Sequence, residues 1–497
     1  MQTSVLRLLT CGSVDDGKST LIGRLLVETD SVPHDTVGAA RHVRRAGSTI
    51  AAGEIDFSLL TDGLEAEREQ GITIDVAYRY FATAHRSFII ADCPGHEQYT
   101  RNMATGASHC QLAITLIDAR SGVTTQTRRH AFIASLLGIC HVVAAVNKMD
   151  LVGWGEGRFR EIESEFLDYC VKVGIAGPIA VPVSALTGEN VVTRGTNTAW
   201  YSGAPILELL EKVRVEHASP VAPFRMPVQY VIRPSLDFRG FAGTIASGTV
   251  KAGDRVRIMP SGRETRVRRI ARSTEDGGDL SLARAPQSVV ITFEDEVDCS
   301  RGDVVSCFGG STETLVAQKF ECDLVWMDET PLTAGKTYLL KCGTRTTPAR
   351  VTRVRHCVNV DTLEAQQTDA LALNDIGRIE IETEQPIAFD PYRRIHGTGS
   401  VILIDRMTNA TSAAGMIRTG DASDAHARRA HWETTAAPTL RAPVGQSLVS
   451  TAAREARWKQ KPLAILLYGS SGSGKTTRAF ELERGLFEKG HAVVVLD

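Results

Sequence analysis

The stretch that decides the fold of this 497-residue chain reads Gly12-Ser13-Val14-Asp15-Asp16-Gly17-Lys18-Ser19-Thr20. It matches the pattern G-x-x-x-x-G-K-S/T, follows a short apolar run at residues 6–10 and precedes a helix-like segment at residues 20–26. The glycines allow backbone N–H groups to wrap around phosphate oxygens at a helix N-terminus, while Lys18 adds a positive charge and Ser19 can ligate Mg²⁺. This stretch therefore predicts a phosphate-binding loop at the start of an α/β domain.

A second motif, Asp92-Cys93-Pro94-Gly95-His96, stands directly after the apolar run 88–91. This order places Asp92 at the carboxyl end of a predicted strand, where its carboxylate can hold the shell of a magnesium ion. Gly95 permits its N–H to approach a terminal phosphate closely, and His96 follows where a residue must orient the attacking water. Taken alone, the motif could equally be an ordinary strand-to-turn junction with a structural histidine.

Two further motifs predict which base is bound. Asn147-Lys148-Met149-Asp150 follows the apolar run 142–146, and Ser184-Ala185-Leu186 follows the run 180–183. The Asp150 carboxylate can accept hydrogen bonds from guanine N1–H and N2–H₂ together, whereas adenine has no such donor pair on that edge. The second motif can offer a backbone N–H to the guanine oxygen. We therefore expect GTP as the nucleotide.

Between the first two motifs, residues 65–75 change from a charged, helix-like run to a β-branched run. Thr73 is the candidate to bridge Mg²⁺ and the γ-phosphate and to be released after hydrolysis. Most of the charged residues around it fit a solvated face. The predicted metal ligands are Ser19, Thr73 and Asp92, and the predicted catalytic residues are Lys18, Thr73 and His96. Because the four motifs each follow a predicted strand, they indicate one doubly wound nucleotide site.

The rest of the sequence predicts further domains. Three prolines within residues 218–227 indicate a domain boundary, since neither helix interiors nor central strands accommodate them. Short β-branched runs with glycine turns then continue to about residue 405, which is typical of small β-barrels. Residues 408–461 suit a linker, either partly helical or disordered. The predicted domains are residues 1–218 (α/β P-loop GTPase domain), 222–312 and 315–406 (two all-β barrels), 407–460 (linker) and 461–497 (truncated second α/β P-loop domain).

Composition narrows the class of protein. The formal net charge is -2, so the chain has no overall cationic field of the kind that holds nucleic acid non-specifically. The ten cysteines lack C-x-x-C pairs, as expected for buried thiols in a reducing compartment. No signal peptide fits before the phosphate loop, and no apolar run approaches the ~20 residues that span a bilayer. We expect a cytoplasmic protein without a nucleic-acid or membrane partner.

These motifs resemble the translation-factor GTPases over about residues 5–405. Within that class, residues 12–26, 60–77 and 95–108 look more like the large subunit of bacterial sulfate adenylyltransferase, since elongation factors usually have histidine where Ser13 and Asp16 stand and threonine in place of Ser19. The resemblance implies that GTP hydrolysis drives ATP and sulfate to adenylyl sulfate and pyrophosphate on a separate small subunit of the ATP-pyrophosphatase type. The sequence contains neither an H-x-G-H nor an S-G-G-x-D-S stretch, in agreement with adenylation on that partner.

A second glycine-rich loop is Gly469-Ser470-Ser471-Gly472-Ser473-Gly474-Lys475-Thr476. It follows a predicted buried strand at residues 462–468 and precedes a helix-like segment at residues 478–486, and it resembles the opening of adenylylsulfate kinase. Because one strand and one helix cannot bury a core, we expect no kinase turnover, and ATP binding by this loop stays open. A fortuitous glycine-rich tail is the alternative.

Two other functions fit parts of the sequence. One is an elongation-factor-like GTPase that binds tRNA through a basic stripe, for which the candidate residues are Arg263, Arg266, Arg268, Arg269 and Arg272. A solvated barrel face explains these arginines equally well. The other is a regulatory GTPase without a coupled reaction. Pyrophosphate release from ATP and sulfate would separate both from the first interpretation.

Overall fold

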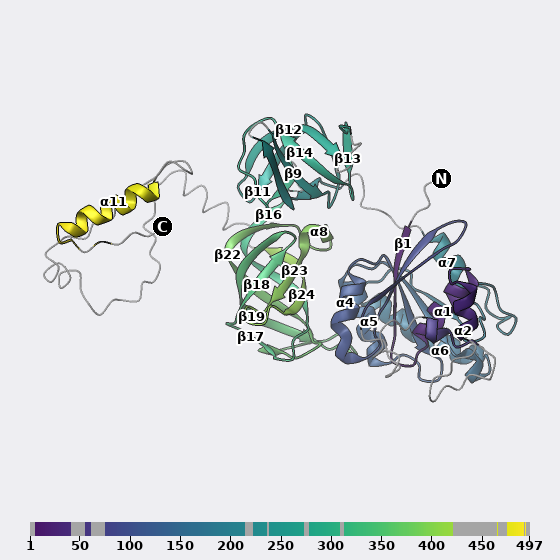
Figure 1. Ribbon diagram of the computed structural model, residues 1–497. Helices are drawn as coiled ribbons and strands as arrows, with labels where there is room; N and C mark the ends of the chain where they lie inside the picture. Colours follow the sequence, from purple (N-terminus) through teal and green to yellow (C-terminus); the bar gives the residue numbers. More distant parts are fainter. Residues whose placement is uncertain are drawn as a thin grey trace. The chain divides into compact units, whose positions relative to one another are not determined.

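The computed structural model describes residues 5–40, 55–60, 75–213, 222–235, 238–272, 278–308, 313–420, 465, 475–491 and 493. The chain divides into two compact units, Met1–Arg428 and Arg429–Asp497. The first unit contains an α/β domain followed by two β-rich domains, and Figure 1 shows the elements of each. The expected fold class, an α/β GTPase-type domain with two barrels after it, is confirmed.

The first domain is built on a six-stranded sheet with the order β2-β3-β1-β4-β5-β6. All neighbouring strands run parallel except β2, which is antiparallel to β3. The strand β4 is buried at every position, so both faces of the sheet are covered, and this explains the continuous apolar runs. The strands are β1 (Val5–Cys11), β2 (Ala77–Ala82), β3 (Ser87–Asp92), β4 (Leu112–Asp118), β5 (His141–Asn147) and β6 (Ile179–Pro182).

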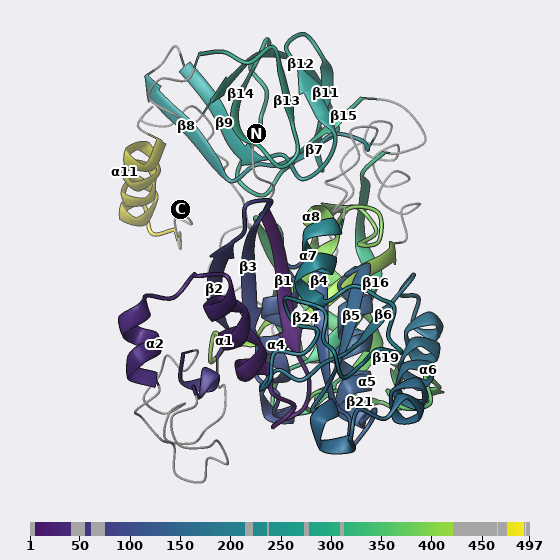
Figure 2. The same cartoon turned by 90° about the vertical axis from the view of Figure 1, so that its right-hand side faces the viewer.

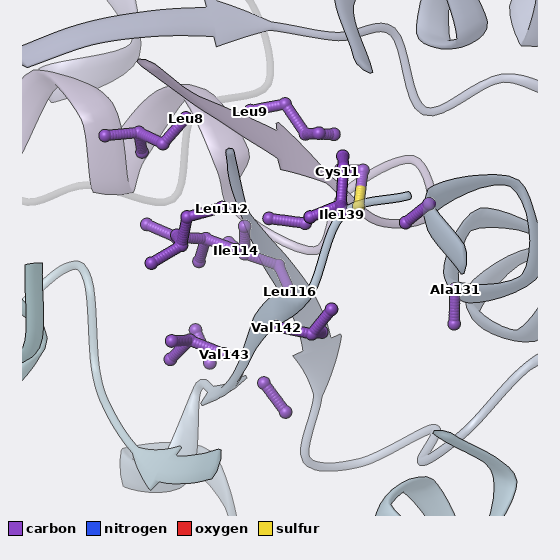
Figure 3. Close-up of a cluster of buried hydrophobic side chains, with 14 of the residues drawn as sticks. Leu8, Leu9, Cys11, Leu112, Ile114, Leu116, Ala131, Ile139, Val142 and Val143 are labelled. Atoms are coloured by element: carbon purple, nitrogen blue, oxygen red, sulfur yellow. The ribbon is translucent and has the colours of Figure 1, made fainter. Parts of the chain in front are cut away.

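Helices connect these strands (Figure 2). They are α1 (Lys18–Glu28), α2 (His34–Ala40), α4 (Thr100–Ala107), α5 (Thr125–Leu136), α6 (Glu156–Lys172) and α7 (Ile206–Lys212), with the short 3-10 helices η1 (Phe57–Leu60), η2 (Glu97–Tyr99) and η3 (Met149–Val152). Figure 3 shows Leu9 of β1, Ile114 of β4, Val142 of β5 and Ala131 of α5 among the buried side chains of the core. This core holds the carboxyl ends of the strands in place, and the four predicted motifs follow β1, β3, β5 and β6.

The second domain is a seven-stranded antiparallel sheet with the order β7-β15-β11-β12-β14-β9-β8 and a small sheet of β10 and β13. Backbone hydrogen bonds between Arg225 and Ala246 and Ser247 connect β7 to the segment after β9. The strands are β7 (Arg225–Pro227), β8 (Tyr230–Ser235), β9 (Phe238–Thr244), β10 (Thr249–Lys251), β11 (Arg255–Met259), β12 (Arg263–Arg272), β13 (Leu282–Arg284), β14 (Ser288–Phe293) and β15 (Val304–Cys307).

The third domain is a closed barrel, because β18 pairs with both β23 and β19 in the order β18-β23-β24-β16-β22-β19. Closure removes the exposed sheet edges. The elements are β16 (Leu315–Trp326), β17 (Leu332–Thr333), β18 (Thr337–Cys342), β19 (Arg345–Val358), β20 (Ala365–Gln366), β21 (Ala370–Leu371), β22 (Ile376–Phe389), α8 (His396–Gly399), β23 (Ser400–Ile404) and β24 (Thr411–Gly420).

The expected start of the linker at residue 407 is wrong, because β24 is an inner strand of the third domain that pairs with β16 and β23. Its small residues carry little apolar signal in the sequence. They are needed for packing: a Cβ on Gly415 would lie 2.6 Å from the Sγ of Cys322 on β16. The described part of the predicted linker therefore belongs to the barrel, and residues 421–460 lie outside the described residues.

Among the described residues of the second unit, the main element is the helix α11 (Lys475–Glu488), which confirms the helix predicted at residues 478–486. The loop residues 469–474 lie outside the described residues, and Lys475 and Thr476 begin the helix. Of the predicted strand 462–468, the structure describes Ile465 alone, which is 53% exposed and in no strand. That observation differs from the expected buried strand, since the described residues of this unit include a helix but no sheet on which to bury Ile465.

Two further expectations concern the whole chain. All ten cysteines are free thiols, and most are buried, although Cys140 is exposed. In the part of the chain that the structure describes, every helix falls short of the length and apolar character that crossing a membrane requires.

Candidate functional site

The phosphate loop connects β1 to α1 and is shaped by its glycines. Gly12 has a φ of 150° and Gly17 a φ of 90°, and Gly17 is the N-cap of α1. The Lys18 ammonium turns back into the loop and donates to the carbonyl oxygens of Gly12 (3.2 Å) and Ser13 (2.7 Å). Burial lowers the pKa of Lys18, and the carboxylates of Asp16 and Asp92 oppose that shift. A single buried cation thus lies at the N-terminus of a helix, where a phosphate is favoured.

The Asp16 side chain forms a hydrogen bond within the same loop. Its Oδ2 oxygen accepts the Ser13 N–H at 2.5 Å, and the residue is only 6% exposed. Burial raises the pKa of the Asp16 carboxyl to about 6, against the pull of Lys18. By contrast, Val14 and Asp15 are exposed, and Asp15 has a positive φ of 66°. Asp16 was expected to bind nucleotide, and the geometry gives its side chain a role in holding the loop.

The motif after β3 lies against the phosphate loop. Asp92 is 2% exposed and accepts the Thr10 hydroxyl at 3.2 Å. A Cβ on Gly95 would lie 2.8 Å from the Gly12 carbonyl oxygen and would also overlap the Lys18 ammonium, so only glycine fits this close approach. Between them, Cys93 is fully buried, and burial raises the pKa of its thiol well above the ordinary value.

His96 follows this turn and is exposed. Its Nδ1 accepts the Gln98 N–H at 3.3 Å, and its ring meets the ring of Tyr99 edge-on with centroids 6.0 Å apart. The contact through Nδ1 leaves Nε2 as the ring nitrogen on the far side, where a water could be oriented. Thr73, the third expected catalytic residue and expected metal ligand, lies outside the described residues.

Asn147 links the phosphate loop to the base motifs. It is 2% exposed, donates from Nδ2 to the Asp16 carbonyl oxygen at 2.8 Å, and accepts the Ala185 N–H at Oδ1 at 2.9 Å. A Cβ on Gly17 would overlap the Asn147 amide nitrogen, so the two segments are in close contact. Asn147 therefore takes the Ala185 N–H, and the backbone N–H that the 184–186 motif is expected to offer to guanine is not this one in the structure.

The other base residues surround this link. Ser184 is 1% exposed and its hydroxyl accepts the Thr187 N–H at 3.3 Å, while Leu186 is 42% exposed. The Asp150 carboxylate oxygen Oδ1 is buried and has no hydrogen-bond partner among the described residues. Leaving a buried carboxylate oxygen unpaired is costly, so a ligand donor is expected there.

One residue of the site, Asp118, was not predicted from the sequence. Asp118, at the carboxyl end of β4, accepts hydrogen bonds from Lys148 (3.0 Å) and from Arg120 (2.6 Å). Burial opposes its ionisation, yet these donors hold the pKa of the Asp118 carboxyl well below its ordinary value. Asp118 therefore fixes the side chain of Lys148, which belongs to the base motif at residues 147–150. The rule that located Asp92 and Asn147, a polar residue at the end of a buried strand, would have found Asp118 as well.

The basic residues of the alternative tRNA function lie on β12. Arg263, Arg266, Arg268, Arg269 and Arg272 are all exposed on this strand. Two of them have local partners, since Arg269 pairs with Asp279 and Arg266 donates to the Gly253 carbonyl oxygen at 2.9 Å. These contacts fit a solvated face with its own counter-charges.

Comparison with known proteins gives two family matches. Residues 3–218 match the elongation factor Tu GTP binding domain, and residues 319–418 match the GTP-eEF1A C-terminal domain-like family. The second match ends within β24, in agreement with the longer third domain. The structure of sup35 complexed with GMPPNP covers 84% of this chain and 94% of its own at 23% identity, but its TM-score of 0.38 is too low to support an argument.

Relatives extend this likeness over the whole chain. The bifunctional enzyme CysN/CysC of Rhodopirellula baltica is 48% identical over 499 residues, which span 100% of this chain and 76% of the relative. The sulfate adenylyltransferase subunit 1 of Chromobacterium violaceum is 54% identical over 413 residues, or 83% of this chain and 86% of the relative. The subunit 1 of Laribacter hongkongensis is 52% identical over 419 residues.

Proposed function

This chain belongs to the sulfate adenylyltransferase subunit 1 family of GTP-binding enzymes, and we propose that its GTP hydrolysis drives adenylation of sulfate by ATP on a separate subunit. The products are adenylyl sulfate and pyrophosphate. The observation that carries the choice of nucleotide is the buried Asp150 oxygen without a partner among the described residues. Guanine N1–H and N2–H₂ would supply the missing donors, and adenine would not.

The phosphate end of the site supports binding of a magnesium triphosphate. The Ser19 hydroxyl and the Asp92 carboxylate are hard oxygen ligands of the kind that Mg²⁺ prefers, and the carboxylate is already held by Thr10. We propose Ser19, Asp92 and Thr73 as the residues that hold the ion. When bound, Mg²⁺ would neutralise charge on the β- and γ-phosphate oxygens. Lys18 adds a second positive charge at the same phosphates.

The hydrolytic step follows from these positions. Water attacks the γ-phosphorus, the bond from that phosphorus to the β–γ bridging oxygen breaks, and the protons of the water stay on the inorganic phosphate that is released. GDP leaves with the electron pair and with its negative charge opposite Lys18. We propose that His96 orients the attacking water through Nε2. Gly95 brings its N–H next to the γ-phosphate, because its lack of a side chain lets the turn touch the phosphate loop.

The adenylating chemistry is proposed to lie on a small subunit of the ATP-pyrophosphatase type. The sequence lacks both the H-x-G-H and the S-G-G-x-D-S stretches. A protein called subunit 1 also implies another subunit in the relatives. In this arrangement the chain would act as the energy-supplying partner, and GTP hydrolysis would change its contacts with the small subunit.

Pyrophosphate release from ATP and sulfate tests this function. The purified chain is mixed with a small subunit that carries the S-G-G-x-D-S loop, with GTP, with a non-hydrolysable GTP analogue or with neither. We expect release to require both proteins and hydrolysable GTP. Equal stimulation by the analogue would favour a regulatory switch without energy coupling. No stimulation together with GTP-dependent tRNA binding would favour the translation-factor alternative.

We also propose that residues 461–497 correspond to the start of an adenylylsulfate kinase domain and give no kinase turnover in this chain. The similarity to a bifunctional CysN/CysC enzyme supports the first part. The exposure of Phe480 (51%) and Phe487 (72%) on α11 supports the second, since these apolar side chains are not covered by a core among the described residues. Formation of 3'-phosphoadenylyl sulfate by this chain from adenylyl sulfate and ATP would refute it.

A further inference from the structure

Arg24 belongs to α1, the helix that follows the phosphate loop. Its side chain contacts residues 184–186, which we call the base loop. Its Nε donates to the Ala185 carbonyl oxygen at 3.1 Å, and its Nη2 donates to the Leu186 carbonyl oxygen. These residues lie more than 160 positions further along the chain. The Arg24 side chain is only 15% exposed, and its hydrogen bond to Ala185 is partly buried, whereas the one to Leu186 lies at the exposed edge of the loop.

The flat face of the Arg24 guanidinium packs on η1, which precedes Thr73 in the sequence. The Arg24 Cζ is 4.1 Å from the centroid of the Phe57 ring, and Phe57 is 6% exposed. Next to it, a Cβ on Gly23 would overlap the Phe57 carbonyl oxygen, so η1 is packed tightly on α1. Arg24 therefore contacts the base loop with its edge and η1 with its face.

The backbone of Ala185 is held on both sides, at its N–H and at its carbonyl oxygen. Asn147 Oδ1 accepts its N–H at 2.9 Å, and Arg24 Nε donates to its carbonyl oxygen at 3.1 Å. Both side chains are also connected to the phosphate loop. Asn147 donates to the Asp16 carbonyl oxygen, and Arg24 belongs to α1, which begins at the end of that loop. The conformation of the base loop is thus fixed by groups that belong to the phosphate side of the site.

We propose that Arg24 is a positioning residue for guanine, which presets the 184–186 loop for the base and connects that loop to η1. The proposal rests on the GTP site proposed above and adds a residue outside the known motifs. Arginine suits this role because its planar fork donates to two successive carbonyls while its face stacks on an aromatic ring. A lysine ammonium at this position could not do both.

A purely structural role is the competing explanation. Arg24 also pairs with Glu28 one turn later, at 3.0 Å, and such a pair stabilises a helix regardless of nucleotide. The two roles differ in what they affect. A base-loop role requires the carbonyl contacts and acts on guanine alone, whereas a helix role requires Glu28 and acts on the whole phosphate loop.

The test compares GTP with inorganic tripolyphosphate, which has the phosphates without the base. Calorimetry with Mg²⁺ measures both affinities in the full-length wild type and in R24K, R24Q and E28Q. We expect R24K to weaken GTP binding about tenfold, the loss of one charge-assisted hydrogen bond, with tripolyphosphate binding unchanged. R24Q, which is shorter than arginine and carries no charge, should lose at least as much GTP affinity as R24K, and E28Q should match the wild type.

The matched control is R160K. Arg160 on α6 pairs with Glu163 at 2.8 Å and lies 5.8 Å from the Trp200 ring centroid, so it combines ion pairs with an aromatic contact, and its hydrogen bonds go to Glu156 and Glu163 rather than to residues 184–186. We expect it to leave both affinities unchanged. Equal losses of GTP and tripolyphosphate binding in R24K, or an E28Q loss as large as that of R24K, would overturn the proposal. If R24K does not fold, unchanged GTP binding by R24Q would overturn it.

These outcomes are separable from those of the proposed function. If the wild-type chain binds tripolyphosphate but not GTP, the choice of guanine nucleotide fails, and this inference fails with it. If the wild type binds GTP and the arginine variants bind it equally well, only the positioning role is lost. Melting temperatures of all variants, measured without nucleotide, identify any general loss of stability.

Discussion

Asn147 donates from Nδ2 to the carbonyl oxygen of Asp16 across 2.8 Å, although the two residues are 131 positions apart in the sequence. The same amide accepts the Ala185 N–H at Oδ1. One buried side chain therefore connects the phosphate loop with the base loop. Because both of these hydrogen bonds are to protein groups, Asn147 holds the two loops together before any nucleotide arrives.

Replacing Asn147 by alanine should separate the two loops. The change removes both hydrogen bonds and leaves the buried Ala185 N–H without its acceptor, so we expect GTP and GDP affinity to fall by about 100-fold. Nucleotide affinity can be measured by fluorescence with a labelled GDP. Circular dichroism should show a folded protein. Unchanged affinity in a folded N147A variant would mean that the loops are held by other contacts.

Replacing Asp150 by asparagine should change the preferred base. The amide can donate, so it pairs with the carbonyl oxygen of xanthine where the carboxylate accepts from guanine. We expect D150N to lose at least tenfold in GTP affinity, roughly one charge-assisted hydrogen bond, and to prefer xanthosine triphosphate. Competition between the two nucleotides gives the measurement. A D150N variant that binds GTP as the wild type does would contradict the assignment of Asp150 to the base.

Much of the first domain could be predicted because buried parallel strands leave a direct signal. All of β4 is buried, so its residues form an unbroken apolar run, and the motif positions follow from where such runs end. The strand β24 gave no such signal. Its Gly415 packs against Cys322, and small residues chosen for close packing resemble a linker in composition.

The motifs of the candidate site could be predicted from the sequence, but the hydrogen bonds that connect them could not. Spacing in the sequence shows that Asn147 and Ala185 each follow a strand, but not that their side chain and backbone pair with each other. The contact of Arg24 with Ala185 joins positions 161 residues apart and belongs to no motif. Such long-range contacts depend on packing, which the one-dimensional pattern does not contain.

The Asp16 carboxyl predicts an unusual pH dependence of stability. Burial raises its pKa in the folded protein to about 6 from an ordinary value of 3.8. The folded chain therefore binds a proton more readily than the unfolded chain between about pH 4 and 6. The stabilising effect of this proton is fully present below pH 4 and is lost as the pH rises through 6.

The variant D16N isolates this effect, because its amide oxygen can still accept the Ser13 N–H but carries no charge. Without nucleotide, we expect D16N to melt at a temperature higher than the wild type by roughly 3 °C at pH 7.5. The difference should shrink as the pH falls through 6 and disappear below about pH 4, as Asp16 becomes neutral in the unfolded state as well. Melting curves across this pH range provide the test. A difference that is constant with pH would show that Asp16 does not titrate in this window.

Replacing His96 by alanine should separate catalysis from binding. The side chain is exposed, and its Nδ1 contact is with the local Gln98 N–H, so its loss leaves the phosphate and base loops intact. We expect single-turnover GTP hydrolysis to slow by about 100-fold, the usual scale for a positioned acid–base side chain, while GTP affinity changes less than about threefold. H96Q, which can still orient a water, should recover part of the rate. A collapse of GTP affinity in H96A would make His96 a structural residue, and an unchanged rate would move the water-orienting role to another group.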